Sequence, residues 1–324
     1  MGQRYSVNVK VAGVNIQFIS EMEVDICDLR ILFKHHLADP PADGTFHTVE
    51  IRTVHKSIVP DDARQVWQGY YHGVGRRKGE SQNTIKKYIS ADGQKEYFLT
   101  TGGECIVNDL TTGMTICTLI NKRQPFKTRY ERSKIGTIII LLVHVVMAYH
   151  RRYTLHAAAV VWKERAIVFT GKSGQGKSTL CTDLVAQGAG FLGDDIVFIY
   201  MDDGKPQIAS LLFDAKLFES SKKDKDFIDI LERYRCQHIE SVPLQAIAEI
   251  HQTREGASTL TKETDEDRLL AVFLTAANNI ALQYDHDDWM TLCASVMGSS
   301  CLYTFHFGDR KLLNATILDE FYGQ

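Results

Sequence analysis

The chain has 324 residues, of which 44% are hydrophobic and 24% are charged, a composition typical of a folded protein with about two domains. Lys and Arg (37) nearly balance Asp and Glu (40), so the net charge of -3 gives no support for a nucleic-acid partner. The seven cysteines include no C-x-x-C pair, which argues against a disulfide framework or a zinc ribbon and predicts reduced thiols in the cytoplasm.

The first part of the sequence is rich in predicted strands, because Val and Ile alternate with polar residues. The strand-like runs are residues 5–18, 48–54, 96–100, 104–108 and 117–120. A loop is expected at residues 39–44, and residues 121–134 are basic and loop-like. We therefore expect a smaller β-rich N-terminal domain over residues 1–133, followed by an α/β domain over residues 134–324.

The most apolar run covers residues 135–149 and contains no formally charged side chain. It is shorter than the ~20 residues that a membrane-spanning helix needs, so it predicts a buried core helix. The first residues of the chain also lack the apolar segment of a secretory signal. No membrane partner and a cytoplasmic location are expected.

A complete G-x-x-x-x-G-K-[ST] motif follows the strand-like residues 166–169 and precedes a helix-like run, which is the setting of a phosphate-binding loop. The residues expected to bind a nucleotide are Gly171, Ser173, Gly174, Gln175, Gly176, Lys177, Ser178 and Thr179.

Each residue type in this motif has a chemical reason. Glycines adopt positive φ, which lets successive backbone N–H groups turn toward phosphate oxygens, and the helix N-terminus adds partial positive charge. Lys177 is expected to reach the outer phosphates, and the Ser178 hydroxyl to hold a Mg²⁺ that bridges them. The sequence therefore predicts a site for a nucleoside triphosphate and Mg²⁺.

Several further elements are expected in the second domain. A strand is expected at residues 157–162, before the strand that leads into the glycine-rich loop. The helix after the loop should end at the glycines of residues 187–190. The later predicted elements are a strand at 191–198, a helix at 220–235, a strand at 244–250 and a helix at 265–278.

Three side chains near the loop suit phosphoryl transfer, which needs a phosphate cradle, metal ligands and a carboxylate to orient or deprotonate the attacking hydroxyl. His156 precedes the loop, and the adjacent carboxylates Asp194 and Asp195 follow it. If the strands that carry these residues are neighbours in one sheet, all three side chains lie at the same edge as the loop.

The spacing of His156, the glycine-rich loop and the Asp194-Asp195 pair resembles that of the HPr kinase/phosphorylase family of phosphoenolpyruvate carboxykinase-like P-loop kinases. The resemblance implies an α/β fold with a mixed sheet and binding of ATP and Mg²⁺. It also implies that Lys177 contacts the phosphates, that Asp194 is the general base with His156 as its partner, and that Ser178 and Asp195 hold the metal. The division of labour between the two aspartates stays open.

The chain departs from that family because no E-[IV]-R-G-[LI]-G segment follows Asp195, which argues against phosphorylase activity. Residues 11–16 and 155–160 instead resemble HPr-kinase-like proteins of peptide modification, among them kinases of lasso peptide precursors. The resemblance implies transfer of the γ-phosphoryl group to a serine hydroxyl of a peptide, for example the C-terminal serine of such a precursor.

Other functions remain open at this point. The same residues would suit a kinase of HPr or of a small hydroxyl compound, and a regulator that binds a nucleotide without catalysis. The sequence also leaves a homo-oligomer open.

Overall fold

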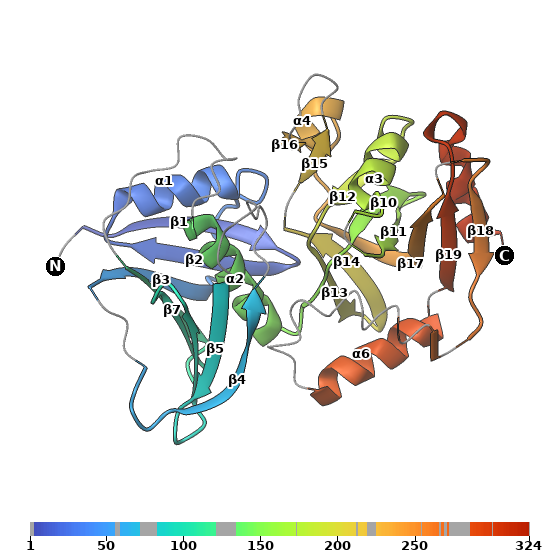
Figure 1. Cartoon of the computed structure of the whole chain (residues 1–324). Helices are drawn as coiled ribbons and strands as arrows, with labels where there is room; N and C mark the ends of the chain where they lie inside the picture. The colour runs from blue at the N-terminus through green and yellow to red at the C-terminus, as the bar shows by residue number, and fades with distance from the viewer. Residues whose placement is uncertain are drawn as a thin grey trace. The chain divides into compact units, whose positions relative to one another are not determined.

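The computed structural model describes residues 3–55, 59–71, 83–120, 134–172, 174–211, 213–218, 225–253, 255–265, 267–268, 271, 286–299 and 301–323. The fold is mixed α/β, and its contacts divide the chain into two units, Met1–His150 and Arg151–Gln324. Figure 1 shows each unit built on its own sheet.

The first unit is an eight-stranded sheet in the order β1-β2-β3-β8-β7-β6-β5-β4. Its strands are β1 (Tyr5–Val11), β2 (Val14–Ser20), β3 (His47–Val54), β4 (Arg64–Tyr71), β5 (Asn83–Ile89), β6 (Lys95–Thr100), β7 (Cys105–Asp109) and β8 (Met114–Ile120). Strand β3 runs parallel to both of its neighbours, and the other pairs are antiparallel. Ala12 and Gly13, both at positive φ, form the two-residue turn between β1 and β2. The predicted strands of this part are present, except that residues 5–18, expected as one strand-like run, form the hairpin of β1 and β2.

Two helices accompany this sheet, α1 (Glu23–Leu32) and α2 (Lys134–Tyr149). Helix α2 is buried from Ile138 to Met147 on every side, as expected for an apolar core helix. Its contacts place it in the first unit, whereas the expected boundary after residue 133 assigned it to the second. Among the described residues, no helix is long and apolar enough to cross a membrane.

A buried hydrogen-bond chain ties the end of α2 to the sheet. Thr115 donates its single hydroxyl proton to Asn108 Oδ1 (3.2 Å), so it accepts from His47 Nε2 (2.8 Å). His47 Nδ1 then accepts from His150 Nε2 (3.0 Å), which fixes His47 as the neutral ring. Burial, aided by the charge of His150, lowers the pKa of His47 to about 4.

We expect the protein to lose stability as the pH falls from 6.5 toward 4, because unfolding releases His47 to bind a proton that the folded state excludes. The contribution of this one ring is about 3 kcal/mol. Urea unfolding of the wild type and of His47→Gln at pH 7 and pH 4.5 tests the effect, because Gln retains one donor and one acceptor. An equal loss of stability in both proteins would contradict it.

The second unit is a nine-stranded mixed sheet, with β12-β10-β11-β17-β14-β13-β9 in order and β19 and β18 continuing from β17. Its strands are β9 (Tyr153–Leu155), β10 (Ala158–Trp162), β11 (Arg165–Thr170), β12 (Gly190–Gly193), β13 (Val197–Asp202), β14 (Lys205–Ser210), β17 (Ser241–Gln252), β18 (Thr259–Lys262) and β19 (Cys301–Phe307). Strands β11, β17 and β19 are parallel, so their carboxyl ends meet at one edge.

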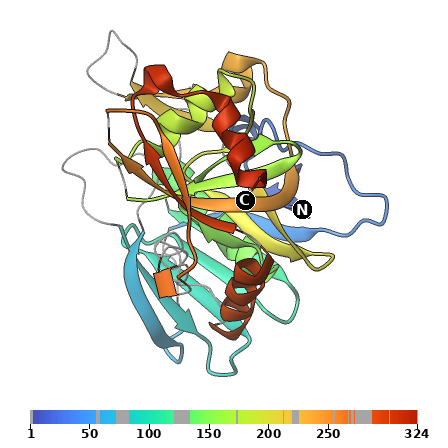
Figure 2. The same cartoon turned by 90° about the vertical axis from the view of Figure 1, so that its right-hand side faces the viewer.

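Helices cover both faces of this sheet, and successive residues of β10 and β11 alternate between two apolar clusters. One cluster contains residues of α3 (Lys177–Val185), of α4 (Ile230–Tyr234) and of the 3-10 helix η2 (Ala315–Tyr322), together with part of the pair β15 (Asp214–Phe218) and β16 (Lys225–Asp229). The other contains residues of α6 (His286–Ser299). Figure 1 and Figure 2 show α3 and α6 on opposite sides of the sheet.

Two predicted elements are corrected by the structure. Residues 220–235 were expected to be helical, but β16 pairs with β15, and only the short helix α4 follows. Sheet pairing thus overrides the helical pattern of this charged segment. Residues 191–198 were expected to form one strand, but the chain breaks between β12 and β13 at the two aspartates. The predicted helix at residues 265–278 lies mostly outside the described residues.

Candidate functional site

The glycine-rich loop joins the end of β11 to the start of α3. Gly171, Gly174 and Gly176 have φ values of 140°, 87° and 92°, which side chains other than glycine rarely adopt. A Cβ on Gly171 would also overlap the Gln175 side chain, whose Oε1 accepts a hydrogen bond from the Lys172 N–H at 2.7 Å. The loop conformation therefore depends on glycine at these positions.

Lys177 begins α3 and folds back over the loop. Its Nζ donates to the backbone carbonyls of Gly171 (2.8 Å) and Lys172 (3.4 Å), and the side chain is buried. Burial lowers the pKa of Lys177, and this is opposed by the negative charges of Asp195 and then Asp194. The ammonium group thus lies between the loop and the two carboxylates, next to the first N–H groups of the helix, which have no acceptor within the helix.

The strand register brings the predicted site residues to one edge. In β10, Ala158 lies opposite Phe169 of β11, so His156 lies beside the end of the strand that leads into the loop. Gly193, at the end of β12, lies opposite Ala159 of β10, so Asp194 follows at the same edge. The expected convergence of His156, the loop and the aspartates is therefore present in the fold.

Asp194 is the most unusual group of the site, because its side chain is 1% exposed. Among the described residues, neither of its carboxylate oxygens has a hydrogen-bond partner of normal geometry. Burial first, and then the charge of Asp195, raise the pKa of Asp194 to about 7, while the nearby Ser178 hydroxyl opposes this rise. A carboxyl group with this pKa can bind or release a proton near neutral pH.

Asp195 forms a tight reversal of the chain, with φ of 65° and a hydrogen bond of 2.8 Å from the Ile196 N–H to the Asp194 carbonyl. The carbonyl of Asp195 accepts a hydrogen bond of 3.1 Å from His156 Nδ1, which therefore carries the proton. The sequence led us to expect the His156 ring to pair with Asp194. The structure shows this ring bonded to the backbone of the pair, at the turn that carries both carboxylates. The pairing of His156 with the Asp194 side chain stays a prediction.

The remaining predicted site residues lie at the start of α3, except for one that is outside the described residues. Ser178 and Thr179 are half-buried in the first turn of the helix, and Ser178 lies against Asp194. Ser173 lies outside the described residues. Ser178, Asp194 and Asp195 are thus the side chains that the fold places around the front of the loop.

These residues fit a nucleoside triphosphate with Mg²⁺. The glycines leave room for backbone N–H groups to face phosphates, and the buried oxygens of Asp194 supply acceptors. Across the described part of the chain, no group of three His, Cys, Asp or Glu residues could hold a metal by itself. Mg²⁺ differs from metals that need such a group, because it binds through one or two carboxylates, waters and the phosphates of a substrate.

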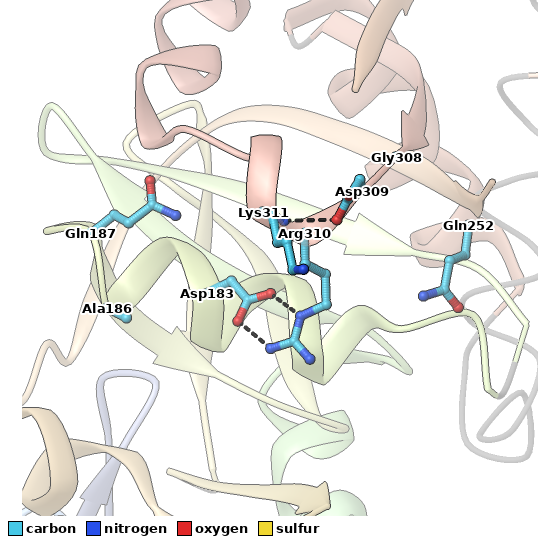
Figure 3. Close-up of a pocket in the computed structure, with 8 residues that line it drawn as sticks. All are labelled: Asp183, Ala186, Gln187, Gln252, Gly308, Asp309, Arg310 and Lys311. Atoms are coloured by element: carbon cyan, nitrogen blue, oxygen red, sulfur yellow. Dashed lines mark hydrogen bonds and ion pairs between the residues drawn. The ribbon is translucent and has the colours of Figure 1, made fainter. Parts of the chain in front are cut away.

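Sequence reasoning missed a hollow of about 590 Å³ beside α3, lined by residues of α3, the end of β17 and the segment after β19 (Figure 3). Only Gln252 carried a signal in the sequence, because it is a polar residue at the end of the predicted strand at 244–250. The partners Asp183 and Arg310 are too far apart in the chain for a pattern to connect them.

Comparison with family models found no match, and comparison with curated proteins also found none. A solved structure that the fold resembles is the HPr(Ser) kinase/phosphatase from Coxiella burnetii, with 11% sequence identity and a TM-score of 0.33. The similarity covers 52% of this chain and 93% of that one. A likeness at this level carries no argument about function, which has to come from the residues of the site.

Proposed function

We propose that this protein is an ATP-dependent kinase that transfers the γ-phosphoryl group to a serine hydroxyl of a peptide. The observation that supports the proposal is Asp194, a buried carboxylate that lies against Ser178 at the start of α3 and whose oxygens have no hydrogen-bond partner of normal geometry among the described residues. Its pKa of about 7 suits a general base that works at neutral pH.

The residues of the site divide the work of phosphoryl transfer. The loop N–H groups and Lys177 hold the outer phosphates, and Asp194 accepts the proton of the serine hydroxyl. The serine oxygen then bonds to the γ-phosphorus as the bond to the β-phosphate oxygen breaks. The products are the phosphoserine, ADP and a proton held on Asp194. Ser178 and Asp195 would hold Mg²⁺, which neutralises phosphate charge when bound.

The identity of the acceptor peptide rests on the sequence alone. The segments at residues 11–16 and 155–160 resemble kinases of lasso peptide precursors, so a precursor with a C-terminal serine is the first acceptor to test. The β-rich first unit and the chain after residue 200 are the parts that we expect to recognise it.

Incubation with Mg-ATP and a candidate precursor should increase the mass of the precursor by one phosphoryl group, located on a serine by fragmentation. Parallel reactions with HPr and with small hydroxyl compounds identify the acceptor class. A precursor with its C-terminal serine replaced by alanine is the matched control. Tight ATP binding with no transfer to any acceptor would contradict the proposed kinase and favour a nucleotide-binding regulator.

A further inference from the structure

The hollow beside α3 lies next to the phosphate-binding loop. A Cβ on Gly176, the residue before α3, would be 3.8 Å from Gln252 at the end of β17 and 3.8 Å from Phe307 at the end of β19. Gln252 also lines the hollow, together with Gly308 and Arg310 from the chain that follows β19. Gln252 therefore brings one end of the hollow next to the last residue before α3, while Ala186 and Gln187 place its other end just past the end of α3.

The two sides of the loop have different chemistry. Strands β10 and β12 flank β11 on one side and lead to the buried Asp194, whereas β17 and β19 flank it on the other and lead to the hollow. Neighbouring strands are about 4.8 Å apart, so each side extends roughly 10 Å from the loop. A nucleoside triphosphate has the γ-phosphoryl group at one end and the nucleoside at the other, and its phosphates bind at the loop between them. If Asp194 acts on the γ-phosphoryl group on its side of the loop, the nucleoside lies on the opposite side, over β17 and β19.

The side chains of the hollow suit a planar, uncharged group. Arg310 forms two hydrogen bonds with Asp183, of 2.7 and 2.6 Å, which hold its guanidinium in a fixed plane (Figure 3). Such a plane can stack on a nucleotide base. The exposed amide of Gln252 carries a donor and an acceptor, the pair that recognises N6 and N7 of adenine.

The charge of the hollow also disfavours a second phosphate site. Asp183 and Asp309 balance Arg310 and Lys311, so its lining side chains carry no net charge. The amide of Gln187 is already used, because it donates to the Leu313 carbonyl and accepts from the Ala315 N–H. Gln252 and the Arg310 plane are thus the groups with which the hollow can recognise a ligand.

We propose that this hollow binds the purine nucleoside of the triphosphate, with Arg310 stacked on the base and Gln252 hydrogen-bonded to its edge. The inference rests on the proposed function, because it needs the phosphates to occupy the adjacent loop.

The test compares the binding of Mg-ATP and of Mg-tripolyphosphate, which lacks the nucleoside, by calorimetry. The wild type should bind Mg-ATP at least about tenfold more tightly. Ala186→Trp should remove this preference, because the exposed Ala186 lines the hollow and an indole would fill it. Its affinity for tripolyphosphate should stay within about twofold of the wild type. The matched control is Ala294→Trp, at an exposed alanine of α6 on the other face of the sheet.

Two smaller changes test the assigned contacts without filling the hollow. Gln252→Ala should weaken binding of ATP more than that of CTP, and Arg310→Lys should weaken both, since Lys keeps the charge but loses the plane. Neither should alter tripolyphosphate binding. An unchanged preference for ATP in Ala186→Trp and in both of these variants would overturn the nucleoside site. If the wild type bound neither ATP nor tripolyphosphate, the phosphate-binding loop itself would be refuted, a failure of the proposed function.

Discussion

Asp194→Asn is expected to lower the rate of phosphoryl transfer by roughly 10²- to 10⁴-fold while Mg-ATP still binds. Asparagine has nearly the same shape as aspartate but cannot take the proton of the attacking hydroxyl. The loop does not depend on this carboxylate, because Lys177 and Gln175 hold it through their own hydrogen bonds. Single-turnover phosphorylation measures the rate, and calorimetry measures the binding of Mg-ATP.

The control for this variant is Asp203→Asn, which makes the same change in the turn after β13 and should leave transfer unaffected. The pH profile provides a second readout. If Asp194 is the base, the wild-type rate should fall about tenfold per pH unit once the pH lies below the pKa of this carboxyl group, which burial raises. Transfer by Asp194→Asn within about tenfold of the wild type would remove Asp194 from the base role.

The raised pKa of Asp194 also means that its ionised carboxylate lowers the stability of the folded protein. Between its ordinary value of 3.8 and about 7, the folded protein binds a proton that the unfolded chain has released. Stability is therefore lost as the pH rises through this window, by about 4 kcal/mol for this group. The same Asp194→Asn protein should accordingly gain stability relative to the wild type between pH 5 and pH 8. This gain separates a strained functional carboxylate from one that stabilises the fold.

The sequence was sufficient to place the residues of the candidate site near one another in the fold, because the backbone of this region depends on local spacing. The glycines at 171, 174 and 176 are needed for positive φ, and the apolar run before them predicts a buried strand. The convergence of His156 with the aspartates followed from a single assumption, that their strands are neighbours. In each case a short segment carried enough information to place the backbone.

The parts that could not be predicted depend on contacts between distant segments. The break at Asp194 and Asp195 interrupts a run that has the composition of one strand, and the carbonyl of Asp195 is held by His156 from another strand. Residues 225–229 form a strand because β15 is available to pair with them. Helix α2 belongs to the first unit, where His150, just after its end, bonds to His47 of β3. The periodicity of hydrophobic residues in the sequence does not predict these contacts.

Gly308 occupies a different kind of constrained position, since its space rather than its φ requires glycine. A Cβ there would overlap the carbonyl oxygen of Gly256 and lie 2.9 Å from the carbonyl carbon of Ala257. This backbone cannot withdraw freely, because the Gly256 carbonyl accepts from the Asp309 N–H at 2.9 Å and Ser258 Oγ accepts from the Gly308 N–H at 3.2 Å. We expect Gly308→Ala to lower the free energy of unfolding by about 3 kcal/mol, measured by urea titration.

The matched control is Gly298→Ala in α6, where a Cβ would meet nothing within 4 Å. Alanine is a better helix former than glycine, so this second change should raise the free energy of unfolding by about 0.5 kcal/mol. The same chemical substitution is thus predicted to have opposite signs at a buried glycine, Gly308, and at an exposed glycine, Gly298, of the second unit. Equal effects at the two positions would mean that the turn before Arg310 is loosely packed. The Arg310 plane would then lack the fixed backbone that a nucleoside site beside α3 requires.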